Sequence, residues 1–419
     1  MFKPMNKIKS IAFLDPNTNS EMDEKLNLSK KFLLFLLSIF LSWKLLRLIY
    51  SVELLWNLHN YLIVLFSFIS IGFSLKYNLY LKRSRTAVLV TFFILLSVVR
   101  LAVFPTADPF FLASFVFCLY FLMLTIFLKT SIQSGFKCFE VLLIFLFIYN
   151  LFDFIDANST ILNVINYKAP SFMEGMMTPM DQRSQLLFSS SMTDGVVIRS
   201  IGVSGTNYAS SALNAASAIY FFILGRRALF YLTSILLLLW GVGSSVFALI
   251  CVMSLLAIRS KWIVIIIPIA LIAIYFLFAS RGWDPSHLFQ VINNFGATSF
   301  MAAIIFGEGT SISSLHSEFR ILGLIFSLGL FGVLFLGCML LNYATFTKYA
   351  KLKRNNHFKA GLYFILVLLL STFHYNTLFV YPNIFFVVML LALSSVGYIK
   401  MRENLSLTSK DIYQSEKNS

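Results

Sequence analysis

Charged side chains are scarce in this chain, and acidic ones are the scarcest. Only 12% of its 419 residues are Asp, Glu, Lys or Arg, while 58% are hydrophobic. An ordinary soluble domain has about 25% charged residues, so this composition excludes one. The 33 lysines and arginines outnumber the 18 acidic residues, which gives a net charge of +15. In a soluble protein that charge would suggest nucleic acid as a partner. In a chain this apolar, basic loops on the cytoplasmic side of a membrane explain it, and we expect no nucleic acid.

Cysteine is also rare, and its spacing excludes two common kinds of site. The four cysteines lie within or beside apolar runs, without C-x-x-C or Cys/His spacing: Cys118, Cys138, Cys251 and Cys338. This pattern supports neither a disulfide framework nor a zinc site. The segments that we predict below to be external contain no DxD-like motif or clustered carboxylates, so we expect no metal and no cofactor.

Long apolar runs are what the sequence has in abundance. Runs of about 20 residues, the length that crosses a bilayer as a helix, recur from residue 32 to residue 399. They predict an all-α, polytopic membrane protein with about 12 transmembrane helices. The predicted spans are 32–50, 59–77, 86–104, 110–128, 138–156, 207–224, 228–244, 246–258, 262–280, 320–342, 361–380 and 382–399. The seventh and eighth are one apolar stretch that we divide at "GVGSS" (241–245).

The basic residues predict the orientation of these spans. Most of them fall in alternate loops and in both tails, residues 1–31 and 400–419, which places both termini in the cytoplasm. The transmembrane domain, 32–399, then has two long external loops, at about 157–206 and 281–319. The basic residues that oppose the rule lie in external loops or in the outer halves of spans: Lys44, Arg47, Arg100, Lys168, Arg183, Arg199, Arg281 and Arg320.

The first long external loop ends in an unusual segment, "IRSIGVSGTNYASSALNAASA" (198–218). Arg199 and two glycines stand just before a predicted helix rich in small residues. Glycine lets the backbone approach a ligand closely, and a helix N-terminus favours anions. Because a guanidinium binds phosphate oxygens bidentately, arginines gathered here would suit a lipid-linked diphosphate. The alternative is that Arg199, Arg281 and Arg320 pair with carboxylates such as Asp153.

A second polar segment, "FGEGTSISSLHSEFR" (306–320), precedes the span 320–342. Ser313 or Ser314 can cap this helix, which would put His316, Glu318 and Arg320 in its first turns. A carboxylate or imidazole beside a phosphate-binding arginine has the ingredients of a general base for a sugar hydroxyl. The alternative is a glutamate that stabilises a helix N-terminus, next to a solvated histidine.

The first of these segments resembles the middle external loop of the Wzy-type O-antigen polymerases and of the related WaaL-type O-antigen ligases. That loop typically reads Arg-x-x-Gly and then Asn/Tyr at the start of a helix. The counterparts here are Arg199, Gly202, Asn207 and Tyr208.

The later loop resembles the same superfamily. The counterparts are Arg281, "FGEG" (306–309), His316 or Glu318, Phe319, and Gly329 with Gly332. Glu318 stands at the spacing where the His form of the pattern has its histidine, while His316 comes two residues early. The resemblance therefore favours Glu318 at the catalytic position, and a polymerase over a ligase.

The resemblance implies a GT-C-like, metal-independent glycosyltransferase at the outer face of a bacterial inner membrane. It would join undecaprenyl-diphosphate-linked glycans, with a chain-length regulator and a flippase as further partners. Arg199, Arg281, Glu318 and His316 would be catalytic. Further substrate-binding candidates are Arg320, Arg100, Arg47, Asn207 and Tyr208, although Arg47 and Arg100 could simply extend to the membrane interface. The rival of another class is a flippase or secondary transporter, against which the sequence shows no internal repeat.

Overall fold

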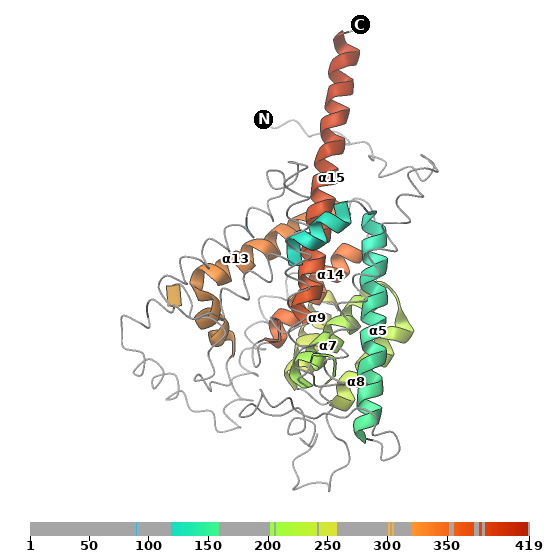
Figure 1. Ribbon diagram of the computed structural model, residues 1–419, viewed down its shortest axis with the longest axis vertical. Helices are drawn as coiled ribbons and strands as arrows, with labels where there is room; N and C mark the ends of the chain where they lie inside the picture. The colour runs from blue at the N-terminus through green and yellow to red at the C-terminus, as the bar shows by residue number, and fades with distance from the viewer. Residues whose placement is uncertain are drawn as a thin grey trace, which may run out of the picture.

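The computed structural model describes residues 89, 119–128, 130–158, 202–204, 207–240, 243–257, 301, 304–305, 320–351, 356–372, 377–378 and 382–417. This part of the chain is helical and contains no strand, so the all-α prediction is confirmed for it (Figure 1). The helices are Leu119–Leu128, α5 (Ile132–Asn158), α7 (Asn207–Ile223), α8 (Arg227–Trp240), α9 (Gly243–Ala257), α13 (Arg320–Lys351), α14 (Asn356–Ser371) and α15 (Asn383–Lys417).

Several helix boundaries agree with the sequence prediction. α7 begins at Asn207 and α13 at Arg320, the first residues of the predicted spans 207–224 and 320–342. The apolar stretch 228–258 is divided between Trp240 and Gly243 into α8 and α9, as the glycines there predicted. Apart from Leu89, the predicted spans 32–50, 59–77, 86–104 and 262–280 lie outside the described residues.

α14 and α13 differ from the prediction. The predicted span 361–380 is a helix that starts earlier and ends earlier, at Asn356–Ser371. It ends where the hydroxyls of Thr372 and Thr377 bond to the carbonyl of Leu368, 2.7 and 3.3 Å away. α13 is interrupted at Gly329 (φ 71°, ψ 170°), where we expected a continuous helix, and it continues to Lys351. Glycine tolerates this backbone conformation because it has no Cβ.

Two of the described helices are long and apolar enough to cross a membrane: Ile132–Ile155 within α5 and Asn383–Met401 within α15. α5 exposes apolar side chains at intervals of three and four residues, which places them on one helix face: Val141, Phe145, Ile148, Phe152 and Ile155. An apolar face of this kind suits contact with lipid. The lower half of α15 lies within the helical body, and its C-terminal half projects beyond it (Figure 1).

α7 lies at the centre of the packing, against α14, α8 and α9. The side chains of Ala212, Ala215, Ala216 and Ala218 are fully buried. Small residues let neighbouring helix backbones approach one another, which explains the alanine- and serine-rich sequence of α7. Tyr220 and Phe221 then fill the space at the other end of the helix.

α5 and α7 run in opposite directions, and contacts at their two ends differ in chemistry. At one end, which we call the turn end, Asn150 of α5 lies beside Asn214 of α7. At the opposite end, which we call the basic end, Phe139 of α5 packs on Tyr220 of α7 with ring centroids 5.0 Å apart. The charge distribution predicts the turn end to be external and the basic end to be cytoplasmic.

Candidate functional site

The turn 202–204, just before α7, is held by side chains at each of its three backbone N–H groups. Gly202 N donates to Asp153 Oδ2 at 2.8 Å, and Val203 N donates to Asn150 Oδ1 at 2.9 Å. Ser204 N donates to Ser210 Oγ at 3.0 Å. Three successive N–H groups are therefore fixed by residues of two different helices, α5 and α7.

Glycine is required at position 202. Its φ of 62° lies in the left-handed region, which costs an L-residue with a Cβ roughly 1–2 kcal/mol. A Cβ there would also lie 2.6 Å from Ser210 Cβ and 2.8 Å from Asn150 Oδ1. Both the backbone conformation and the packing thus explain the glycine of the Arg-x-x-Gly pattern.

The rest of the turn-end network joins α5, α7 and α15. Asn150 Nδ2 donates to Asn214 Oδ1 at 3.1 Å, and Ser204 Oγ donates to Asn383 Oδ1 at 3.3 Å. Asn383 Nδ2 donates to the carbonyl oxygens of Ala209 (3.0 Å) and Thr377 (2.7 Å). The side chains of Asn150, Asp153, Asn214 and Asn383 are at most 2% exposed. Burying polar groups is costly unless they are hydrogen-bonded, so these contacts favour one arrangement of α5, α7 and α15.

The turn serves an internal purpose that differs from part of our expectation. We expected Gly202 to let the backbone approach a ligand phosphate. In the structure its N–H instead contacts a carboxylate of the chain itself. The three N–H groups of this turn are therefore bound by side chains of the chain itself.

Of the predicted site residues, three lie within the described part of the chain. Asn207 is the first residue of α7, and Tyr208 follows it with a half-buried side chain. Arg320 is the first residue of α13. Arg47, Arg100, Arg199, Arg281, His316 and Glu318 lie outside the described residues, so their positions and mutual distances stay predictions.

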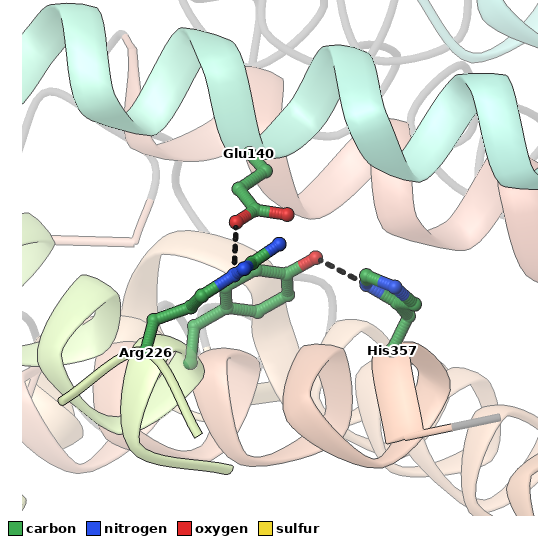
Figure 2. Close-up of polar contacts among 4 residues, drawn as sticks. Glu140, Arg226 and His357 are labelled. Atoms are coloured by element: carbon green, nitrogen blue, oxygen red, sulfur yellow. Dashed lines mark hydrogen bonds and ion pairs between the residues drawn. The ribbon is translucent and has the colours of Figure 1, made fainter. Parts of the chain in front are cut away.

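A second polar cluster lies at the basic end, between α5, α7, α8 and α14 (Figure 2). Arg226 Nε lies 2.9 Å from Glu140 Oε1, and the two side chains are 59% and 13% exposed. Tyr220 Oη and His357 Nδ1 are 3.2 Å apart, and the imidazole is stacked on Phe136 with centroids 5.1 Å apart. Lys400 of α15 reaches the same end, where its Nζ donates to the carbonyl of Thr130 at 2.8 Å.

Burial of the His357 side chain disfavours its charged form. His357 lies in the first turn of α14, before the predicted span 361–380. Burial lowers the pKa of its imidazole below the usual 6.5, Glu140 opposes this shift, and Arg226 adds to it. The cluster thus joins helix ends through the Arg226–Glu140 ion pair and the contact between Tyr220 and His357.

The sequence did carry a signal for the turn-end network that we did not use for the site. Asn150 and Asp153 interrupt an apolar run with a spacing of three, which puts both on one helix face. Polar residues inside apolar spans usually face the protein interior and have a function. Asn214, in the middle of α7, and Asn383, at the start of α15, gave the same signal.

Within the described residues, no group of three or more His, Cys, Asp or Glu side chains could hold a metal ion. Cys138, Cys251 and Cys338 are free thiols. Comparisons of the chain with models of protein families, with curated proteins and with solved structures gave no match.

Proposed function

We propose that the chain is an integral membrane glycosyltransferase that polymerises undecaprenyl-diphosphate-linked oligosaccharide units into O-antigen or a related surface polysaccharide. It would act at the outer face of a bacterial inner membrane, as a GT-C-like bundle of about 12 spans with both termini in the cytoplasm. The observation that supports this proposal is the turn at Gly202 together with the start of the next helix. Gly202 has a positive φ that suits glycine, and α7 begins at Asn207. The resemblance to Wzy-type polymerases assigns the Gly of Arg-x-x-Gly and the Asn of Asn/Tyr to these two positions.

The proposed reaction transfers a growing glycan from its lipid carrier to the sugar of another lipid-linked unit. An acceptor hydroxyl attacks the anomeric carbon of the donor, the bond from that carbon to the diphosphate oxygen breaks, and undecaprenyl diphosphate leaves with the electron pair. Glu318, with His316 beside it in sequence, takes the hydroxyl proton. Arg199 and Arg281 stabilise the charge that develops on the leaving diphosphate, while Arg320 and the other basic candidates hold the substrates.

A transporter or flippase is the second candidate, and one observation favours it. Asp153 is a fully buried carboxylate within an apolar helix that is long enough to span a membrane. Carboxylates in such positions often belong to ion or proton pathways. The O-antigen ligase reaction, which uses lipid A core as the acceptor, is the alternative within the enzyme class.

A surface-polysaccharide gel separates these functions. The strain compared is one that lacks the gene, complemented with the wild type or with Arg199→Ala. A deletion that leaves lipid A core with a single repeat unit, and a ladder restored by the wild type alone, supports the polymerase. Bare core with polymer accumulating on undecaprenyl diphosphate would identify a ligase. Bare core with unpolymerised units trapped in the cell would identify a flippase, and both of these results contradict the proposal.

A further inference from the structure

The buried pair Asn150 and Asp153 holds the turn that adjoins the proposed diphosphate site. Both residues lie on one face of α5, and their side-chain oxygens accept the N–H groups of Val203 and Gly202 at 2.9 and 2.8 Å. The two contacts join residues about 50 positions apart in sequence, so they fix tertiary rather than local structure. Burying a carboxylate in an apolar helix is energetically costly. Ionisable residues in such positions usually have a function.

The same turn is fixed from its other side by α7 and α15. The N–H of Ser204 donates to Ser210 Oγ, and the hydroxyl of Ser204 donates to Asn383 Oδ1. Asn383 also binds the carbonyl of Ala209 at 3.0 Å, which ties the first turns of α7 to α15. Residues 202–204 are thus held against three helices, two of which are the candidate membrane spans.

Arg199 precedes this turn by three residues. The contacts that hold the turn therefore lie three residues along the chain from the arginine proposed to bind the diphosphate. Positioning of this kind matters because a displacement of about 1 Å at a reacting centre can lower a rate about 100-fold.

We propose that Asp153 and Asn150 are positioning residues for the glycosyl transfer: they fix the turn 202–204 and, through it, the location of Arg199. This inference rests on the proposed function. Neither residue touches the substrate in this scheme, and both act through backbone N–H groups. The buried carboxylate of α5 is thereby explained without an ion pathway.

Amide hydrogen exchange tests the structural half of the proposal without measuring activity. The purified full-length protein in lipid nanodiscs is compared with Asp153→Ala and Asp153→Asn, and the peptide covering residues 199–206 is followed. We expect exchange at Gly202 to rise roughly tenfold or more in Asp153→Ala, since a buried hydrogen bond to a carboxylate is lost. Asp153→Asn keeps an oxygen that can accept the bond and should show a smaller rise.

The control is Ser395→Ala, which removes the buried hydrogen bond from Tyr120 Oη to Ser395 Oγ (2.9 Å). Ser395 bonds the helix Leu119–Leu128 to α15 away from the turn, so its loss should leave exchange of residues 199–206 unchanged. Polymer formation by the purified protein is then measured for each variant. We expect Asp153→Ala to lower it on the order of tenfold to a hundredfold, and Ser395→Ala to lower it less than about twofold.

A double variant distinguishes positioning from general destabilisation. If Asp153 acts through Arg199, adding Asp153→Ala to Arg199→Lys should lower the rate by much less than it does in the wild type. Equal effects of Asp153→Ala on the rate in the wild type and in Arg199→Lys would overturn the proposal. Unchanged amide exchange at Gly202 in Asp153→Ala would also overturn it. So would faster exchange in Asp153→Ala together with normal polymer formation. If Asp153→Ala does not fold, Asp153→Asn decides by the same readouts. Loss of the polymerase assignment in the deletion strain would refute the proposed function, while exchange still reports whether Asp153 holds the turn.

Discussion

Arg226 Nε lies 2.9 Å from Glu140 Oε1 and so joins the start of α8 to the first turns of α5 (Figure 2). The two partners differ in environment, because the guanidinium is 59% exposed and the carboxylate 13%. The pair lies at the basic end of the body, opposite the turn 202–204. Each end therefore has its own polar contacts between helices, and each can be tested separately.

Loss of the arginine should cost more stability than loss of the glutamate. Glu140→Gln leaves a solvated guanidinium, so it should lower stability by less than about 1 kcal/mol. Arg226→Gln leaves a nearly buried carboxylate without its ionic partner and should cost more. Melting temperatures of the two purified variants and of the double variant check this. Equal losses of melting temperature in Glu140→Gln and Arg226→Gln would contradict this prediction. They would show that the low exposure of Glu140 does not make its unpaired carboxylate more costly.

Gly202→Ala should be much more harmful than Gly225→Ala, although both glycines have positive φ (62° and 74°). At Gly225 an added Cβ meets nothing within 4 Å, so only the backbone cost of roughly 1–2 kcal/mol applies. At Gly202 the Cβ collides with Ser210 and Asn150, which adds roughly 1–3 kcal/mol. Thermal stability and polymer formation are measured for both. Similar losses in the two variants would contradict the close packing of the turn.

The sequence predicted elements that depend on local pattern. The start of α7 followed from the polar "GTNY" before an alanine-rich run, and the separation of α8 from α9 followed from the glycines at 241–243. The end of α14 was missed because hydropathy measures the apolar character of a run. It does not register two threonine hydroxyls that bind the carbonyl of Leu368 and help to end a helix inside such a run.

The turn-end network could not be predicted as a set of contacts. Its hydrogen bonds join Asn150 to Asn214 and Ser204 to Asn383, residues 64 and 179 positions apart. The sequence shows that polar residues interrupt apolar helices, but only the packing of the helices shows which of them meet. The predicted catalytic residues of the loop 281–319 lie outside the described residues. Their roles are therefore tested by measuring the activity of substituted proteins.

Arg199→Ala and Arg281→Ala should each lower polymer formation roughly 100-fold or more at normal protein level, because a leaving diphosphate loses a stabilising charge. Lysine at either position should restore little, since it cannot bind phosphate oxygens bidentately. Arg183→Ala is the matched control, an arginine of the same long loop that we expect to be solvated. The readout is the polysaccharide ladder of complemented strains. A normal ladder in either alanine variant would remove that arginine from the site.

Glu318→Gln should abolish polymer formation, while His316→Ala should have a milder effect, because the resemblance to Wzy-type polymerases assigns the catalytic position to Glu318. Glutamine keeps the shape of the side chain but cannot accept the hydroxyl proton. Protein level in the membrane is measured beside the ladder to separate catalysis from folding. An inactive His316→Ala together with an active Glu318→Gln would assign the base to the histidine instead.

Acidification should destabilise the protein through His357. Because burial holds its pKa below 6.5 in the folded chain, the unfolded chain binds a proton first as the pH falls. Stability is therefore full above about pH 6.5 and declines as the pH falls from there through the folded pKa. His357→Phe keeps the stacking on Phe136 and cannot be protonated, so its melting temperature should fall less between pH 7.5 and 5.5. Identical pH dependence in the two proteins would show that His357 does not control it, since Glu140, which faces the same cluster, is present in both.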